Sequence, residues 1–301
     1  VRASTSRALA AQLRTAAGVR TAYWDWQRAR IDVLVARERL ASARELAADV
    51  SKRVRAGDLA RADQHQADGA FATAEASLAE ASGALAGAEQ QLRALTGVTP
   101  ALAAEGLAVA EPEPAPSGAP ATVEAGHPAV AELRDRAEVA QRSMRLAGIQ
   151  GRANPELNLA TTRERGASGE SWQQTVTLGL RIPFGSDSRN RARVASASAE
   201  AIEAEAQLRL ERERLTSDVD TARVRVESAR TLVASAEQRA QLAREARGFF
   251  EKAFRLGETD LPTRLRIELE AAEAERQVAR TRIELAAAVS ALRQAMGLLP
   301  E

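Results

Sequence analysis

The fold is decided by two related turns, RLGETDLP at residues 255–262 and RAGDL at residues 55–59. Each turn places a glycine, Gly257 or Gly57, directly after a long helical pattern, where a residue in the left-handed conformation commonly ends a helix. In the second turn Asp260 is placed to cap the next helix, and the proline that follows is tolerated in a first helical turn. Each turn therefore predicts a helix that ends and a second helix that returns beside it.

The two turns belong to an internal repeat that includes both arms of the hairpin. With Gly57 placed over Gly257, an offset of 200 residues holds to the end of the chain. This alignment pairs Arg55 with Arg255, Leu92 with Leu292, Gly97 with Gly297 and Pro100 with Pro300. Upstream of the glycines the best offset is 186 residues. The two offsets differ by two heptads, and an insertion of whole heptads lengthens a coiled coil without rotating its buried face. The repeat therefore predicts two related helical hairpins.

Apolar residues recur along each predicted arm with alternating spacings of three and four residues. The first arm shows this from Val19 to Val54, and the corresponding arm of the second repeat shows it from Leu215 to Ala243. Alanine often takes one of the two positions, which lets the helix axes approach closely. A sustained period of 3.5 residues predicts left-handed coiled coils. The predicted fold is therefore mostly α, with two long antiparallel coiled-coil hairpins.

The composition suits such helices and excludes several classes of protein. Of the 301 residues, 45% are hydrophobic but only 3% are aromatic, which favours thin helix-on-helix packing over a thick core. The formal net charge of +1 argues against nucleic acid as a binding partner. Cysteine is absent, which excludes disulfides and thiolate metal sites. No motif for catalysis or phosphate binding is present, so we expect neither an enzyme nor a cofactor. His65 and His127 are interpreted as ordinary surface or capping residues.

The region between the hairpins follows a different pattern. Residues 100–126 are rich in proline and predict a linker between a first domain at 1–99 and a second domain at 127–301. The second domain is predicted to begin with a helix at 128–148 and to end with the long hairpin at 188–299.

Residues 156–184 predict a β-hairpin between that helix and the second long hairpin. Val176, Leu178, Leu180 and Ile182 alternate with polar or small residues, so one face of the strand is apolar. An isolated two-stranded hairpin is marginal in water. Strands of this kind, with aromatic residues near their ends, are typical of a transmembrane β-barrel, although half-buried hairpins of soluble proteins have the same pattern.

This order of elements resembles the TolC-like outer-membrane efflux proteins. The stretches that carry the resemblance are His127–Val130, Asn154–Leu157, Leu178–Phe184, Arg255–Leu261 and Leu292–Gly297. The tip sequence GETDLPT is most similar to the cation-efflux, CzcC-like branch.

The resemblance implies a homotrimer in the outer membrane of a Gram-negative bacterium. The β-hairpins would contribute to a transmembrane β-barrel in contact with lipid, and the helices would lie in the periplasm. The implied function is a passive conduit in a tripartite efflux system, with a periplasmic adaptor protein and an inner-membrane RND-type pump as partners. Heavy-metal cations are the favoured substrate, and drugs are possible. Family protomers give four strands where this sequence shows two, so we expect an N-terminal part to be missing.

One alternative is a periplasmic coiled-coil adaptor or a structural protein of an export complex. Adaptors also contain a long helical hairpin, but they normally carry one hairpin within strand-rich domains, whereas this sequence predicts two hairpins and few strands. This difference favours the channel.

The resemblance also implies functional residues at the tips and on the strands. The predicted adaptor contacts are Arg55, Gly57, Asp58, Leu59, Arg255, Gly257, Glu258, Asp260 and Leu261. Six of them are equally well explained as turn residues, namely Arg55, Gly57, Asp58, Arg255, Gly257 and Glu258. The predicted lumen-facing residues are Thr175, Thr177 and Arg181. Of these, Arg181 is expected to pair with a neighbouring carboxylate rather than to select ions. Trp24 and Trp26 are interpreted as residues that fill a helix seam or groove.

Overall fold

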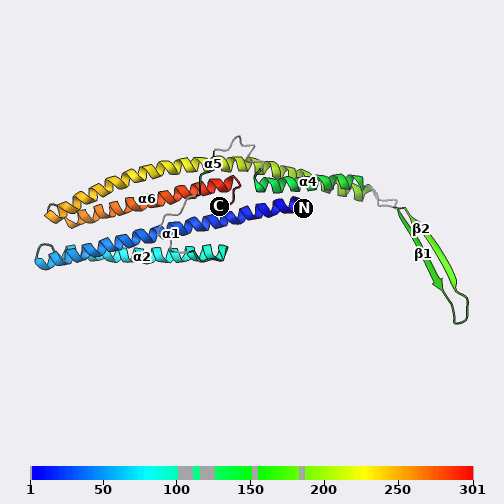
Figure 1. Cartoon of the computed structure of the whole chain (residues 1–301), viewed down its shortest axis with the longest axis horizontal. Coiled ribbons are helices and arrows are strands. Elements are labelled where there is room, and N and C mark those ends of the chain that lie inside the picture. The colour runs from blue at the N-terminus through cyan, green and yellow to red at the C-terminus, as the bar shows by residue number, and fades with distance from the viewer. Residues whose placement is uncertain (1, 101–110, 116–125, 151–154, 183–186, 301) are drawn as a thin grey trace. The chain divides into compact units, whose positions relative to one another are not determined.

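The structure is a computed structural model that describes residues 2–100, 111–115, 126–150, 155–182 and 187–300. It confirms the mostly α fold with one antiparallel β-hairpin. The elements in chain order are α1 (Arg2–Ala56), α2 (Arg61–Thr96), α4 (Pro128–Ile149), β1 (Glu156–Glu164), β2 (Gln173–Arg181), α5 (Asp187–Leu256) and α6 (Leu261–Ala295) (Figure 1).

The chain divides into two compact units. One unit comprises Val1–Arg7 and Ala129–Glu213, which include α4, the two strands and the first part of α5. The other comprises Ala8–Pro128 and Arg214–Glu301, which include α2, α6 and the remainder of α1 and α5. The division into domains at 1–99, 100–126 and 127–301 follows the sequence repeat and stays a prediction.

The second unit contains two helical hairpins, α1 with α2 and α5 with α6 (Figure 1). Gly57 and Gly257 end the first helices with φ of 88° and 77°. The turns are alike in their backbone bonds, because the amide of Asp58 donates to the carbonyl of Arg53 and the amide of Glu258 donates to that of Ala253, both at 2.9 Å. This is the bonding of a Schellman cap, and the predicted turns are confirmed.

Small and aromatic side chains fill the seam between α1 and α2. Ala22, Trp26 and Leu92 form a buried cluster against which Val19 and Leu85 pack. In the second repeat the predicted seam is also buried. Its members with less than a tenth of their surface exposed are Leu215, Val219, Ala222, Val226, Ala229, Ala236 and Ala240. The 3.5-residue period therefore identified the buried face of each long helix.

The two hairpins of this unit meet along α1 and α6. Trp24 is 5% exposed and packs against Ile283 and Ala286 of α6. Since Trp26 faces α2, the two tryptophans fill different seams on opposite sides of α1, which is consistent with their interpretation as packing residues. On the other side of α6, Arg282 donates to Glu237 of α5 at 2.5 Å. The order of packing is thus α2, α1, α6, α5, with α2 and α5 at the edges.

Residues 111–115 of the predicted linker contact both hairpins. Glu111 accepts a hydrogen bond from Arg20 of α1 at 3.0 Å and lies 3.8 Å from Arg293 of α6. Arg293 also donates to the carbonyl of Pro112 at 3.0 Å. The linker therefore contributes polar contacts to the packing of the hairpins, which its composition did not predict. Residues 101–110 and 116–125 lie outside the described residues.

The two histidines have different environments. His65 is exposed on α2, as predicted. His127 is only 6% exposed, so it is not a surface residue, and it directly precedes α4, the place of a capping residue. A Cβ at Gly297 would lie 2.7 Å from the His127 ring, which shows how closely the end of the second hairpin packs on it. Burial lowers the pKa of His127, because the apolar surroundings disfavour its charged form.

The β-hairpin belongs to the other unit. Its register pairs Leu157 with Leu180, Leu159 with Leu178 and Thr161 with Val176. Both strands lie within the predicted range 156–184, and β2 ends at Arg181, so Ile182 follows the strand. Pro183 and Phe184, the last two residues of the predicted range 156–184, lie outside the described residues. Among the described residues, no helix combines the length and the apolar character needed to cross a membrane.

Candidate functional sites at the hairpin tips and on the β-hairpin

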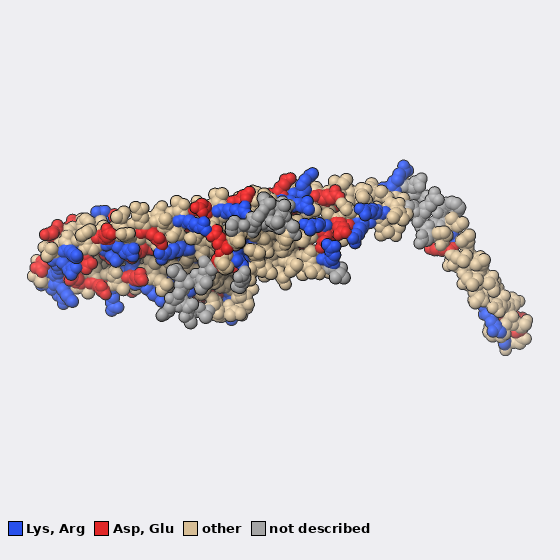
Figure 2. All heavy atoms as spheres, turned by 45° about the horizontal axis from the view of Figure 1, so that its top comes forward, with Lys and Arg blue, Asp and Glu red and all other residues tan. Residues whose placement is uncertain are grey.

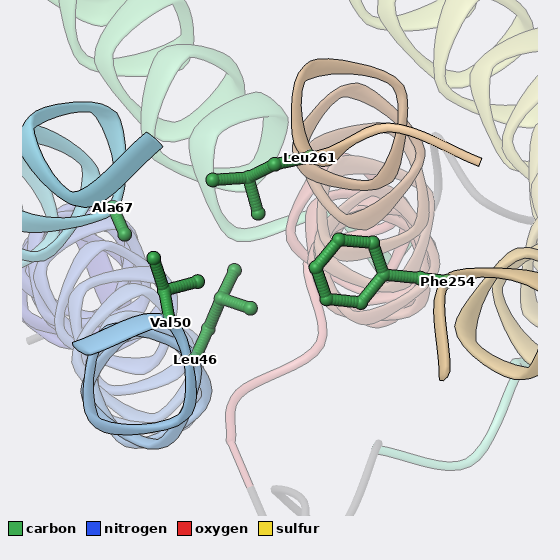
Figure 3. Close-up of a cluster of buried hydrophobic side chains, with 5 residues drawn as sticks. All are labelled: Leu46, Val50, Ala67, Phe254 and Leu261. Atoms are coloured by element: carbon green, nitrogen blue, oxygen red, sulfur yellow. The ribbon is translucent and has the colours of Figure 1, made fainter. Parts of the chain in front are cut away.

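The turns of the two helical hairpins lie together because five apolar side chains connect them. Leu46 and Val50 of α1, Ala67 of α2, Phe254 of α5 and Leu261 of α6 form one buried cluster (Figure 3). Val50 and Leu261 are at most 1% exposed. Because all four helices contribute, the cluster fixes the two turns as a single tip of this unit.

Two arginines reinforce this cluster at Phe254. The guanidinium groups of Arg53 and Arg264 each lie 4.8 Å from the centre of the Phe254 ring. Arg53 also donates to the carbonyls of Phe254 and Arg255, both at 3.4 Å, at the C-terminal end of α5. A cation is favourable there because the helix end carries partial negative charge. These contacts attach α1 to the end of α5.

Asp260 is the predicted cap of α6 and acts as one. Its side chain accepts a hydrogen bond from the Thr263 amide at 3.0 Å. Hydrogen bonds from Thr263 lower the pKa of Asp260, because they favour the carboxylate. In the first repeat Ala60 occupies the capping position, and its amide instead donates to Asp63 at 3.0 Å. The polar groups of both turns are thus bonded locally.

The predicted adaptor contacts differ in how accessible they are. Seven of them are exposed at the tip, namely Arg55, Gly57, Asp58, Arg255, Gly257, Glu258 and Asp260. Leu59 is half-buried and Leu261 is 1% exposed, and both pack on the tip cluster. These two side chains therefore hold the turns together, and only the other seven of the predicted contacts are open to a partner. Leu256, which the sequence did not single out, is 73% exposed beside them.

A groove of about 990 Å³ lies between the hairpins near the tip. Residues of both signs line it, including Asp49 and Arg53 from α1 and Arg247, Glu268 and Glu275 from the second hairpin. Arg247 lies 3.9 Å from Glu268 and 3.8 Å from Glu275. Across the described part of the chain, no group of three or more acidic or histidine side chains is arranged to hold a metal ion.

The β-hairpin has one apolar face and one polar face. The apolar face carries Leu157, Leu159, Val176, Leu178 and Leu180, each between 63% and 73% exposed. Thr175, Thr177 and Arg181 alternate with these residues, so they lie on the opposite face. Arg181 lies 3.8 Å from Glu156, the residue opposite it in the register, as expected of an arginine that pairs with a neighbouring carboxylate.

The turn end of the β-hairpin carries a cluster that the sequence did not identify. The Trp172 ring is contacted by the guanidinium groups of Arg163 and Arg165, 5.0 and 5.6 Å from its centre. Figure 2 shows the middle of the hairpin largely free of charge, with charged side chains gathered at its turn. The contacts depend on the strand pairing, which brings Trp172 beside Arg163 and Arg165, nine and seven positions before it in the chain.

Comparison with known proteins gives a family for the first third of the chain. Residues 1–98 match the family described as outer membrane efflux protein. No curated protein sequence matches significantly.

Solved structures show the same fold over nearly the whole chain. A membrane protein from Pseudomonas aeruginosa is 19% identical with a TM-score of 0.82, and the match covers 98% of this chain and 68% of that one. The CmeC outer membrane channel of Campylobacter jejuni is 17% identical with a TM-score of 0.80, covering 98% of this chain and 65% of that one. The outer membrane protein VceC of Vibrio cholerae is 19% identical with a TM-score of 0.79, covering 100% and 74%.

Proposed function

We propose that the chain is the outer-membrane channel of a tripartite efflux system. It is similar to TolC-like outer membrane efflux proteins by family over residues 1–98 and by fold over its whole length. Proteins of this family are conduits rather than enzymes. The observation that carries the proposal is the exposed apolar face of the β-hairpin, joined to long helical hairpins. Such a face is costly in water and favourable against lipid.

The predicted location is the outer membrane of a Gram-negative bacterium, with the strands in lipid and the helices in the periplasm. On this proposal the polar face with Thr175, Thr177 and Arg181 lines the lumen. The alternation of the two faces supports the assignment, because a strand in a channel wall meets lipid on one side and water on the other.

Assembly as a homotrimer is supported by two exposed stripes at the edges of the helical unit. On α5, the exposed Leu242, Phe249 and Leu256 repeat every seven residues. On α2, exposed small residues follow a three-four spacing at Gly69, Ala72, Ala76, Ala79, Gly83 and Ala86. Large side chains on one edge and small ones on the other suit head-to-tail contacts, which close into a ring.

The charges beside these stripes are also complementary. Asp68, Glu75 and Glu80 flank the α2 stripe, and Arg239 and Lys252 lie along the α5 stripe. Within the described residues none of these five takes part in an ion pair of its own chain. The cysteine-free chain allows a direct test, because a disulfide between Ala72→Cys and Leu242→Cys of neighbouring copies would form only if these edges meet. Each single variant is the control.

The exposed tip residues are the proposed contact with a periplasmic adaptor, which would connect the channel to an inner-membrane RND-type pump. Three such tips in a trimer, each with two turns, would let weak contacts act together. Heavy-metal cations are the favoured cargo because of the tip sequence GETDLPT, and drugs are the alternative. Growth of cells that depend on this channel, in metal salts and in drugs, separates the two.

The membrane assignment is tested by placing one charge on either face of β2. Leu178→Arg puts a cation on the apolar face, where the cost in lipid is about 2–4 kcal/mol. Thr177→Arg makes a change of the same charge on the neighbouring residue of the polar face. We expect Leu178→Arg to prevent outer-membrane insertion and export of the full-length protein, while Thr177→Arg leaves insertion intact. Equal insertion of the two variants would contradict the proposal.

A further inference from the structure

Arg163 lies on the apolar face of the β-hairpin at its turn end, and Arg165 follows just beyond β1. The register pairs Arg163 with Gln174, two positions beyond the pair of Thr161 and Val176. Because alternate residues of a strand point to the same face, Arg163 continues the row of Leu157, Leu159 and Thr161. The face that is apolar along most of its length therefore ends in positive charge.

Trp172, which directly precedes β2, lies against both arginines. Its ring is contacted by Arg163 and Arg165, yet Trp172 remains 54% exposed. The turn also holds Arg165, whose Nε donates to the carbonyl of Ala167 at 3.0 Å and whose terminal nitrogen lies 3.5 Å from the Ser168 hydroxyl. The guanidinium groups are thus held at one place, and both arginines remain exposed.

Neither arginine is neutralised by a carboxylate of the described chain. No ion pair involves Arg163 or Arg165 among the residues that the structure describes. Glu164 alternates with Arg163 and so lies on the other face, and a Cβ at Gly166 would lie 2.7 Å from the carboxylate of Glu170, which places that group at Gly166. At the other end of the hairpin, by contrast, Arg181 has Glu156 beside it.

We propose that Arg163, Arg165 and Trp172 bind the phosphate groups of anionic lipids. The inference rests on the proposed function, in which the adjoining apolar face contacts lipid chains. A guanidinium group can donate two parallel hydrogen bonds to the oxygens of one phosphate. Tryptophan favours the boundary between lipid chains and water. An apolar surface that leads directly to two cations matches an anionic lipid, whose chains adjoin its phosphate. A free phosphate would gain nothing from the leucine face.

The test uses the full-length chain with a polarity-sensitive dye on Ala167→Cys, which is unique because the chain lacks cysteine. Binding is titrated with vesicles of phosphatidylcholine alone and of phosphatidylcholine with phosphatidic acid. The variant R163Q/R165Q is compared with R225Q/R244Q, which removes the same charge from exposed positions of α5. Each arginine near an anionic surface contributes about fivefold to binding, so R163Q/R165Q should reduce the preference for anionic vesicles about thirtyfold and the control much less.

An unchanged preference in R163Q/R165Q would overturn the inference, as would a dye response to inorganic phosphate equal to that with phosphatidic acid. If the parent chain bound neither kind of vesicle, and Leu178→Arg also bound neither, the result would instead contradict the proposed membrane role of the hairpin. Loss of binding to both vesicles in Leu178→Arg, together with a selective loss in R163Q/R165Q, supports both proposals.

Discussion

At the scale of single residues, Gly257 is constrained by its backbone and not by its neighbours. Its φ is 77°, and no atom lies within 4 Å of the position of a Cβ. Gly257→Ala should therefore destabilise the fold by about 1 kcal/mol through backbone strain alone. Gly248 also has open space around it but lies inside α5, so Gly248→Ala should stabilise the helix by up to about 1 kcal/mol. Thermal unfolding followed by circular dichroism measures both, and shifts of the same sign would contradict the strain argument.

Glu111, in the described part of the linker, has a pKa that is shifted by its contacts with both hairpins. Burial would raise its pKa, but hydrogen bonds from Arg20 and Ser290 and the charges of Arg20 and Arg293 outweigh burial, so the pKa of Glu111 lies below its ordinary value. A carboxyl of this kind contributes stability above its unfolded-state pKa, and the contribution is lost as the pH falls through the folded-state pKa.

Glu111→Gln should therefore lower the free energy of unfolding at neutral pH by about 1–3 kcal/mol, with a smaller difference from the parent chain under acidic conditions. Glu113→Gln is the matched control, because Glu113 pairs with Arg230 on the surface, where an ion pair contributes little. Chemical unfolding at a series of pH values measures the effect. A difference that does not change with pH would show that the carboxylate charge is not its source.

At the scale of elements, α1 packs on two sides through neighbouring tryptophans. Trp26 belongs to the seam with α2, and Trp24 contacts Ile283 of α6. We expect Trp24→Ala and Ile283→Ala to be coupled by about 1 kcal/mol in a double-mutant cycle, since side chains in contact usually show such coupling. Trp26→Ala combined with Ile283→Ala is the control and should be close to additive. Equal coupling in both cycles would contradict the assignment of the tryptophans to separate seams.

At the scale of the whole molecule, export depends on the proposed contact between the tip and an adaptor. Arg255 and Glu258 are exposed at the tip, and the double charge reversal R255E/E258R should abolish export while trimer assembly and membrane insertion continue. The control E138R/R142E exchanges a surface ion pair within α4 and should leave export unchanged. Site-directed crosslinking from position 258 to the adaptor measures the contact itself. Undiminished export in R255E/E258R would contradict the proposed contact and show that Arg255 and Glu258 serve only to form the turn.

The sequence by itself determined the elements of this protein, because their causes are local. The glycines before Asp58 and Glu258 fixed where the hairpins turn, and the three-four spacing through Ala22 and Trp26 fixed which face of α1 is buried. The alternation in β2 likewise fixed its two faces. In each case the residues that matter are at most four positions apart, so their spacing alone specifies the backbone and the side that faces a partner.

Only the tertiary structure decided which distant residues meet. Arg53 bonds Phe254 across 201 positions, and Arg20 bonds Glu111 across 91. Burial of His127 against Gly297 and of Leu261 in the tip cluster has the same origin. These contacts depend on how far one helix is displaced along another and on the path of the linker. No periodic pattern in the sequence specifies either of these features. Heptad packing tolerates several such displacements, and side-chain packing at the tip and the linker selects one of them.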